Sequence, residues 1–598
     1  MDVQAPMNHI DNSTKLIGTI GYLSLTISLV LAILEPPAVN YEFYIYKSLS
    51  PLFWFFSFGS FMIGFITHIH SSRESEYLNW LGMLLCMMST TTILLVPHIR
   101  GYAFMGQGDV LTHVGYVRDI LSLGNFGYNP YPLDHILASS IMYITGISIS
   151  NTFTLIPLSF YIFGMIFTYL LAKCLSINGI EHALIPIILI PIFGSYCYTY
   201  APWFQSFFTI PLMLYLYYKY TMDCQRTKYY IAFIVLIVAL VPYHPLTAGI
   251  TAIMFILLEV SLIIQRYNYK KSNRSDYKLR IFPCILSMGI MLLIFAWPPY
   301  LNMVNNIANS IYEKFIIKSG VSEVSQYMFA VNHLSDYLID TIILLIVRYL
   351  PFALVFAAFV VGMWIILKRK FIYSVSSNGH PSYIFLTTCI ATFTLIMAFL
   401  AFGIRVFDTT RITNLLILII VIFILIIPWG SYANTRKISK RLIICVSAAI
   451  ILIVLLSSIA NLYPSELKMQ ANDQVSSQSI YGMSFFFQCR DDSVPIKEMG
   501  ISQYRYHDAI MGVSEPDKNI RFISPVPKHF GYYGESGNQK LDNNYIIITT
   551  QGEQLYEKIY PSFTKLWSFY PDDYQMFRYD MDTSIIFKNR DLSIYIYS

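Results

Sequence analysis

The feature that most constrains the fold of this chain is a series of long apolar segments before about residue 462. Each segment has roughly 18–25 residues, the length that an α-helix needs to cross the hydrocarbon core of a bilayer. Charged residues in this part lie mostly in short clusters between the segments, and they make up only 13% of the whole chain. A soluble domain has roughly 25%. The pattern therefore predicts a polytopic α-helical membrane protein.

The apolar segments predict about thirteen transmembrane helices. We expect these helices at residues 16–34, 51–69, 78–97, 152–172, 183–199, 204–219, 229–243, 247–264, 281–301, 341–367, 383–403, 411–429 and 441–460. A further apolar segment at 136–149 is too short to cross comfortably. We expect this segment to lie at the interface or to re-enter the membrane.

Basic residues favour one orientation in the membrane. With a cytoplasmic N-terminus, alternate loops are cytoplasmic, and these loops hold most of the basic residues, including the clusters at 266–280 and 436–441. Loops rich in Lys and Arg stay on the cytoplasmic side, so we expect a multi-pass protein of the plasma membrane in this orientation. An odd number of spans places the C-terminal tail outside. The predicted domains are thus a transmembrane domain, 1–462, and an extracytoplasmic domain, 463–598.

The tail differs from the rest of the chain because charges become frequent and no apolar run is long enough to span a membrane. Strand-like stretches occur at 545–550, 584–588 and 593–597, and the last two flank a hairpin-type connection at 589–591. We expect a small α/β domain, with the Asp572-Asp573 pair in a loop. The many Tyr and Phe residues favour a packed core over a carbohydrate-binding platform.

The first large outer loop, 98–135, holds the candidate catalytic residues. At 100° per residue, Asp109, His113 and Tyr116 fall on one face of the helix that follows the Gly-rich turn, and Arg118 points the other way. A carboxylate and an imidazole one turn apart suit general-base catalysis or ligand orientation. The alternative is that Asp109 only caps the helix and that His113 is an interfacial side chain.

Other polar residues are predicted on the same outer face. His244 ends a helix in the sequence PYHP, and Arg405, Asp408 and Arg411 lie in the short link GIRVFDTTR. An arginine at this depth can bind a phosphate oxygen through two donors, although interfacial snorkelling also explains such residues. An acid, histidines and arginines on one face are more informative than any one of them.

Several other classes of protein find little support. The net charge of +5 gives no indication of nucleic-acid binding. No Gly-rich phosphate loop, nucleophile elbow or metal motif is present. A transporter or flippase remains the main alternative, but the predicted spans hold little beyond Glu259 and Arg348 as ionisable groups, and we find no internal repeat. A non-enzymatic cell-surface assembly protein is a third class, which would not need Asp109, His244 and Arg411 together.

The outer loop carries a resemblance to a known family. The sequence GQGDVLTHVGYVRDIL, the pattern Tyr131-Pro132-Leu133-Asp134-His135 and a late outer arginine are similar to the GT-C superfamily of polyprenyl-phosphate-sugar-dependent glycosyltransferases, in particular its archaeal members. The end of the tail, IIFKNRDLSIYIYS, also resembles the strand pair that closes many of those archaeal proteins. The resemblance covers the whole membrane part and, more loosely, the tail.

The resemblance implies a function and site residues. Asp109 would be the catalytic base for an inverting displacement at the anomeric carbon, with His113 beside it. Arg411 or Arg405 would hold the phosphate of a polyprenyl-linked sugar donor. The groups that would orient the substrate are His244, Tyr116, Asp408 and His135. The acceptor would be a lipid, a glycan or a protein.

Metal dependence stays in doubt. Many relatives have two close acids in this loop, whereas here Asp109 stands between Gly108 and Val110. The nearest other acid, Asp119, lies off the helix face that Asp109 shares with His113. A lone carboxylate is a poor site for a divalent cation.

Overall fold

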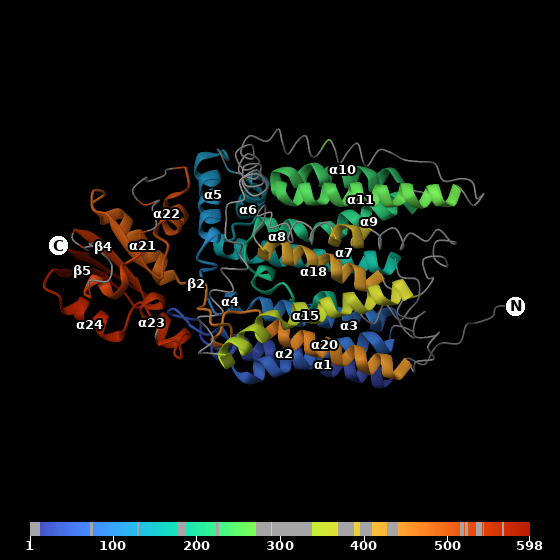
Figure 1. Ribbon diagram of the computed structural model, residues 1–598, viewed down its shortest axis with the longest axis horizontal. Helices are drawn as coiled ribbons and strands as arrows, with labels where there is room; N and C mark the ends of the chain where they lie inside the picture. Colours follow the sequence, from blue (N-terminus) through green and yellow to red (C-terminus); the bar gives the residue numbers. More distant parts are fainter. Residues whose placement is uncertain are drawn as a thin grey trace.

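A computed structural model of the chain describes residues 12–71, 76–127, 129, 131–175, 187–222, 226–270, 289, 338–368, 388–394, 409–426, 440–514, 520, 524–533, 541, 543–564 and 567–598. Its largest part is a bundle of apolar helices that run side by side (Figure 1). These helices are α1 (Asn12–Leu34), α2 (Pro51–Ser71), α3 (Glu76–Leu94), α7 (Ile149–Leu175), α9 (Ile210–Met222), α10 (Arg226–Tyr243), α11 (Pro245–Lys270), α15 (Leu338–Lys368), α18 (Thr409–Ile426) and α20 (Lys440–Ala460).

Within the described ranges, 5 helices are long and apolar enough to cross a membrane. The apolar stretches that meet this criterion are Thr14–Leu34, Pro51–His70, Glu76–Leu94, Ile149–Leu175 and Ile342–Trp364. Shorter apolar helices accompany them, at Thr227–Tyr243, Pro245–Ser261, Thr413–Leu425 and Ala448–Ala460. The chain is thus a helical membrane protein, while the number of thirteen spans and the orientation remain predictions.

Two of the predicted spans are wrong where the structure describes them. Residues 187–200, expected within the span 183–199, form turns and short 3-10 segments such as η3 (Gly194–Cys197) instead of a long helix. Gly194 has a φ of 61°, a left-handed conformation that ends regular helix. The span 204–219 is also divided, between α8 (Pro202–Phe207) and α9.

Two further predicted spans lie mostly outside the described residues. Apart from residue 289, the span 281–301 lies outside the described residues. Of the span 383–403, only 388–394 is described, and it is helical.

Two helices lie across one end of the bundle instead of along it (Figure 1). They are α5 (Asp109–Leu123) and α6 (Pro132–Thr145). The helix α6 accounts for the short apolar segment expected at 136–149, and it ends at Gly146, whose φ of 71° is left-handed. The short helix α4 (Val96–Ile99) and strand β1 (Phe104–Met105) lead into α5.

The C-terminal part of the chain lies at the same end of the bundle, beyond α5 (Figure 1). Its helices are α21 (Ser477–Cys489), α22 (Gln503–Met511), α23 (Thr550–Ile559) and α24 (Pro571–Tyr579). Its strands are β2 (Gln474–Val475), β3 (Ile496–Met499), β4 (Asn544–Thr549), β5 (Thr583–Lys588) and β6 (Leu592–Tyr597). Four of these strands form a sheet in the order β3-β4-β6-β5, in which only β3 and β4 pair in parallel.

The three strand predictions in the tail are confirmed to within one residue. The hairpin between β5 and β6 turns at Asn589, whose Oδ1 accepts hydrogen bonds from the backbone N–H groups of Asp591 and Leu592 at 2.9 and 2.8 Å. The prediction of a loop at Asp572-Asp573 is wrong, because both residues lie in the first turn of α24. Asp573 accepts a hydrogen bond from the Tyr570 N–H at 2.7 Å and so caps that helix.

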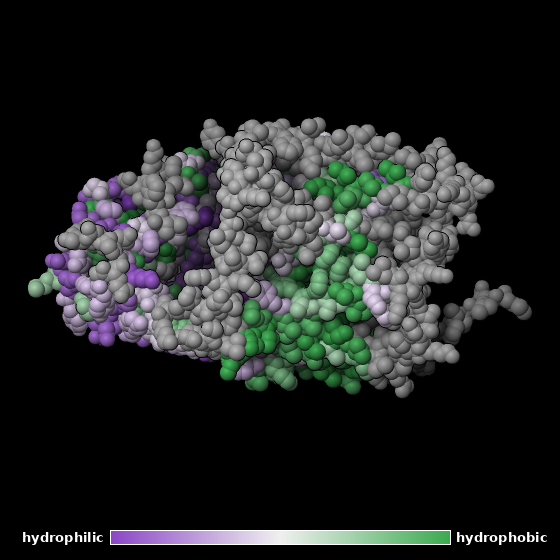
Figure 2. Space-filling view, viewed as in Figure 1, coloured by the Kyte–Doolittle hydropathy of each residue, from purple (hydrophilic) through white to green (hydrophobic). Residues whose placement is uncertain are grey.

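The surface reflects this division between the bundle and the C-terminal part. Hydrophobic residues gather over the bundle and hydrophilic residues over the C-terminal part (Figure 2). The contact between the two parts includes an antiparallel pairing of β1 with β2 and the packing of α22 against α5. The C-terminal part therefore covers the helix that holds the candidate catalytic residues.

Candidate functional site

Asp109 is the first residue of α5, with Gly108 at the N-cap position and no side-chain capping bond. The interpretation of Asp109 as a helix cap is therefore wrong. Its carboxylate Oδ1 instead lies 2.5 Å from Nη2 of Arg505, a residue of α22. The Asp109 side chain is 67% exposed, so the carboxylate is open to a ligand at this end of the bundle.

His113, one turn after Asp109, is buried. Its Nδ1 lies 2.9 Å from Nε2 of His135 on α6, and His135 Nδ1 lies 2.8 Å from Nδ2 of Asn129. If the amide donates to His135, the His135 proton is on Nε2 and is donated to His113. The interpretation of His113 as a simple interfacial side chain is therefore wrong, because it belongs to a buried hydrogen-bonded pair.

The pair is held in its neutral form. Burial, with smaller contributions from the charges of Arg505 and His244, lowers the pKa of His113 to about 3. Burial also lowers the pKa of His135 well below its usual range, because a buried imidazolium loses its hydration. Neither ring carries a charge near neutral pH.

Aromatic rings extend this cluster. Tyr116, the third residue of the predicted helix face, has its ring 5.1 Å from the ring of His135. Tyr131 stacks on His244 with 5.2 Å between the ring centroids, and it also lies 6.0 Å from His113. The structure thus brings His113, Tyr116 and His135 together, and Tyr131 connects them to His244. Arg118, expected on the opposite face of α5, is exposed.

Asp134 is a buried acid beside this cluster. Its Oδ1 accepts a hydrogen bond from the Tyr243 hydroxyl at 2.6 Å, and its Oδ2 has no hydrogen-bond partner among the described residues. Burial raises the pKa of Asp134 to about 7, against the hydrogen bonds from Tyr200 and Tyr243. Asp134 is therefore partly protonated near neutral pH.

Arg411 lies in the first turn of α18. Its guanidinium carbon is 5.3 Å from the ring centroid of Trp203 in α8, a distance at which a cation is attracted to an aromatic face. The other two residues predicted in this link, Arg405 and Asp408, lie outside the described residues.

Tyr131 connects two histidines of this cluster, because its ring lies against both His113 and His244. Asp109 precedes His113 by one turn of α5, and Arg411 lies against Trp203 of α8. Arg411 offers a cation for an anionic leaving group, and Asp109 offers an exposed carboxylate for a proton. This arrangement suits a displacement in which an acceptor is deprotonated and an anion departs.

A small pocket opens beside the first turn of α5. Its lining comes from the end of α3, from α4, β1, α5 and α7, and from the segment before α8, and it includes Met105, Val110, Phe153, Tyr198 and Tyr200. Tyr200 also contacts His113, with 5.7 Å between the ring centroids. The pocket therefore borders the histidine cluster.

The two ionisable groups expected inside spans have separate surroundings. Glu259 is buried and accepts a hydrogen bond from the Tyr217 hydroxyl. Arg348 is exposed on α15, and its backbone carbonyl accepts a hydrogen bond from Asn461 at 3.2 Å. Neither residue belongs to the cluster around His113.

Asp119, the second acid of the outer loop, has a structural role. Its Oδ2 accepts hydrogen bonds from the backbone N–H groups of Val513 and Ser514 at 3.0 and 2.9 Å, and from the Ser514 hydroxyl at 2.8 Å. Among the residues that the structure describes, no three His, Cys, Asp or Glu side chains are close enough to hold a metal ion.

Comparisons with known proteins give similarities of structure alone. No family model matches the sequence, and no curated protein matches it. Solved structures with a similar fold include the oligosaccharyltransferase of Archaeoglobus fulgidus, in complex with zinc and sulfate. Its superposition on this chain has a TM-score of 0.44 at 12% sequence identity and covers 79% of this chain and 69% of the oligosaccharyltransferase chain.

They also include ArnT of Cupriavidus metallidurans in the apo state, with a TM-score of 0.48 and 11% identity over 88% of this chain and 99% of that chain. The same protein bound to undecaprenyl phosphate gives a TM-score of 0.47 at 11% identity, with coverage of 88% and 99%. At TM-scores below 0.5, no residue's role is transferred from them to this chain.

The structure adds site residues that the sequence did not indicate. Arg505 of α22 contacts Asp109 of α5. The two helices are far apart in the sequence: Thr112 and Asp508, which also touch in this contact, are separated by 396 positions. Trp203 lies in an aromatic segment where nothing in the sequence distinguishes it. Asn129 stands close to His135 in sequence and could have been found as an amide in the turn before the YP-x-x-H pattern.

Proposed function

We propose that this protein is a membrane glycosyltransferase that transfers a sugar from a polyprenyl-phosphate donor to an acceptor at the end of the bundle covered by the C-terminal part. The observation that carries the proposal is an exposed Asp109 carboxylate one turn before His113, in a cluster where Tyr131 lies against both His113 and His244. Arg411 supplies a cation against Trp203 of α8. A base for the acceptor and a cation for the departing phosphate are what an inverting displacement with a phosphate leaving group requires.

The proposed reaction needs few groups. Asp109 takes the proton from an acceptor hydroxyl or amine, and the freed electron pair attacks the anomeric carbon of the donor sugar. The bond between that carbon and the phosphate oxygen breaks, and its electron pair leaves with the polyprenyl phosphate. Arg411 stabilises the charge that develops on the phosphate. The configuration of the anomeric carbon is inverted because the acceptor attacks opposite the leaving group.

The orienting roles follow from position. Tyr131 and His244 form a stacked wall between the proposed phosphate and base positions. His113 and His135 are neutral, so they hold α5 against α6 through their hydrogen bond without competing with Asp109 for the role of charged base. The Tyr116 ring packs against the His135 ring.

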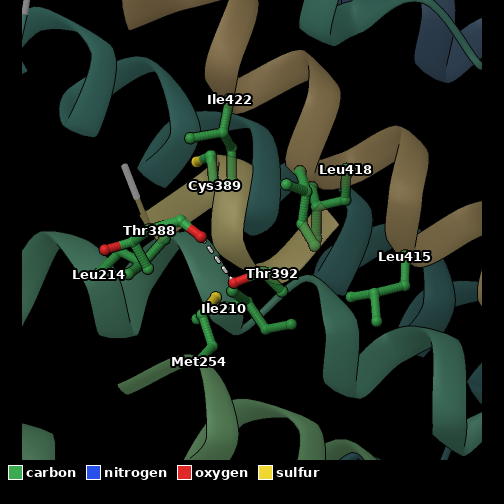
Figure 3. A pocket seen from close by; sticks show the side chains of 10 residues that line it. Ile210, Leu214, Met254, Thr388, Cys389, Thr392, Leu415, Leu418 and Ile422 are labelled. Atoms are coloured by element: carbon green, nitrogen blue, oxygen red, sulfur yellow. Dashed lines mark hydrogen bonds between the residues drawn. The ribbon is translucent and has the colours of Figure 1, made fainter. Parts of the chain in front are cut away.

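The surroundings of Arg411 favour a lipid-linked donor. An apolar pocket begins one turn beyond Arg411 along α18, where Leu415, Leu418 and Ile422 line it. Side chains of α9, α11 and the segment 388–394 complete the pocket, as Figure 3 shows. Apolar surroundings so close to Arg411 favour a donor whose phosphate carries an apolar chain.

The experiment that tests the proposal is transfer of a radiolabelled sugar from synthetic polyprenyl-phosphate donors to membrane extracts that contain the purified protein. We expect Asp109→Asn to lower kcat about 10²- to 10⁴-fold, the usual contribution of a general base. Arg411→Ala is expected to lower both kcat and donor affinity. A matched control is Asp572→Asn, because Asp572 is an exposed carboxylate of α24. No transfer by the wild type with any donor would refute the proposal, and full activity in Asp109→Asn would remove the base from it.

A further inference from the structure

A chain of four polar side chains, taken alternately from α22 and α5, ends on the carboxylate of Asp109. The Thr112 hydroxyl donates a hydrogen bond to Asp508 Oδ2 at 2.8 Å. The same hydroxyl oxygen accepts a hydrogen bond from Arg505 Nη1 at 2.7 Å. Arg505 Nη2 in turn lies 2.5 Å from Asp109 Oδ1. Each donor in this chain has a defined acceptor, so the guanidinium is held in one orientation.

Small residues and hydrogen bonds fix the distance between the two helices. A Cβ atom on Gly115 of α5 would lie 2.3 Å from the backbone oxygen of Asp508, so only glycine permits this approach. Further along α5, the three hydrogen bonds to the Asp119 carboxylate tie the chain that follows α22 to the same helix. The position of Arg505 is therefore set by the whole contact between α5 and α22.

The two members of the ion pair differ in how they are held. The Arg505 side chain is 22% exposed, whereas that of Asp109 is 67% exposed. Arg505 also has its guanidinium carbon 4.7 Å from the ring centroid of Tyr504. Asp109, at the first position of its helix, has no capping bond. The fixed guanidinium is thus the group that orients the more exposed carboxylate.

We infer that Arg505 is a positioning residue for the catalytic base, through which the C-terminal part of the chain completes the active site. The inference rests on the proposed function of Asp109. Arg505 holds Oδ1 in a charge-assisted hydrogen bond, and Oδ2 is left to take the acceptor proton. A base that is misplaced by about 1 Å loses on the order of 10²-fold in rate, so the guanidinium contact matters for turnover and not for donor binding.

Three variants of Arg505 test the inference in the sugar-transfer assay. Arg505→Gln should lower kcat about 10- to 100-fold with little change in the KM for the polyprenyl-phosphate donor. Arg505→Lys should recover part of the loss, because its ammonium can reach one carboxylate oxygen but not the Thr112 hydroxyl at the same time. Arg505→Ala should recover part of its activity when methylguanidine is added. A role in folding alone would not respond to that small cation.

The matched control is Arg118→Gln. Arg118 also reaches from α5 to the C-terminal part, where its Nη1 lies 3.5 Å from the Ile510 carbonyl oxygen, but it is on the opposite face from Asp109. We expect this variant to retain the wild-type kcat.

The other outcomes separate the inference from the proposed function. Active wild type with an unchanged kcat in Arg505→Gln would overturn the inference and leave the proposed function in place. A raised donor KM with unchanged kcat would also overturn it, since Arg505 would then bind substrate. Equal losses in Arg505→Gln and Arg118→Gln, without rescue by methylguanidine, would assign Arg505 a structural role. No transfer by the wild type would overturn both.

Discussion

His113 Nδ1 and His135 Nε2 lie 2.9 Å apart in a buried contact between α5 and α6. Only one of these two nitrogens can carry a hydrogen, because two N–H groups pointing at each other would repel. The contact therefore requires that His113 stays neutral as long as His135 donates to it. This pair joins the helix that carries the proposed base to the helix that carries Asp134.

The first prediction concerns acid stability. The pKa of His113 is about 3 in the folded chain and about 6.5 for an unperturbed histidine. The stability that comes from neutral His113 is thus complete above about pH 6.5 and is lost as the pH falls toward 3. We expect the melting temperature in detergent to fall over this window. In His113→Phe, the free energy of unfolding should fall less steeply with decreasing pH, by roughly 1.4 kcal/mol per pH unit.

The control for this prediction is His70→Gln, because His70 is exposed at the end of α2. This variant shows whether the loss of any histidine changes the slope. If His113→Phe and the wild type show the same slope between pH 4.5 and 6.5, His113 is not held neutral by burial.

The second prediction concerns Asp134, which acts with the opposite sign. Its pKa is about 7 in the folded chain, above the value of about 3.9 for an unperturbed aspartate. Its protonated form stabilises the fold at low pH, and this contribution is lost as the pH rises from about 4 to 7. In Asp134→Asn the amide oxygen can still accept from Tyr243. We expect the variant to gain melting temperature relative to the wild type as the pH rises through this window, measured in the same detergent. A constant difference would show that Asp134 does not titrate there.

The third prediction concerns the packing of α5 on α22. Gly115→Ala should push the helices apart, because the new Cβ would lie 2.3 Å from the Asp508 oxygen, and it should lower kcat more than about 10-fold by displacing Arg505 from Asp109. The matched control is Gly18→Ala, where the nearest atom to a new Cβ would be 3.8 Å away. Sugar transfer and melting temperature are measured for both. Wild-type kcat in Gly115→Ala would show that the distance between the helices does not affect the base.

The fourth prediction concerns the middle link of the polar chain. Thr112→Val removes the hydroxyl that connects Arg505 to Asp508, and we expect it to lower kcat less than Arg505→Gln does. Because both side chains act through one contact, the double variant should be no slower than Arg505→Gln alone. Kinetics of the two single variants and the double variant check this. If the loss of kcat in the double variant equals the product of the losses in the two single variants, Thr112 and Arg505 act independently.

The fifth prediction concerns the aromatic support of Arg411. Trp203→Leu removes the ring 5.3 Å from the guanidinium, an interaction of about 0.5–2 kcal/mol. The KM for the polyprenyl-phosphate donor should therefore rise roughly 2- to 30-fold, while Trp203→Phe should show a smaller rise. Trp80→Leu is the control, since Trp80 is exposed on α3. An unchanged donor KM in Trp203→Leu would separate Trp203 from donor binding.

The sequence by itself determined the helical membrane architecture. The length of an apolar run and the spacing of charges are local features of the sequence. They predict helices such as α1, α7 and α20, where a long apolar run forms one continuous helix. They also led to β5 and β6, where alternation and an Asn-containing turn are local features. The prediction failed at 187–200, because proline and glycine there broke a segment that hydropathy alone made continuous.

Part of the candidate site was also open to prediction. Helical periodicity placed Asp109, His113 and Tyr116 on neighbouring positions of α5, and the topology placed His244 and Arg411 at the same end of the bundle. Only the tertiary structure decided what these residues contact. The pairing of His113 with His135, and of Asp109 with Arg505, depends on how α5 packs against α6 and α22. Such contacts between residues distant in sequence leave no local periodicity, and so the role of the C-terminal part emerged only from the folded chain.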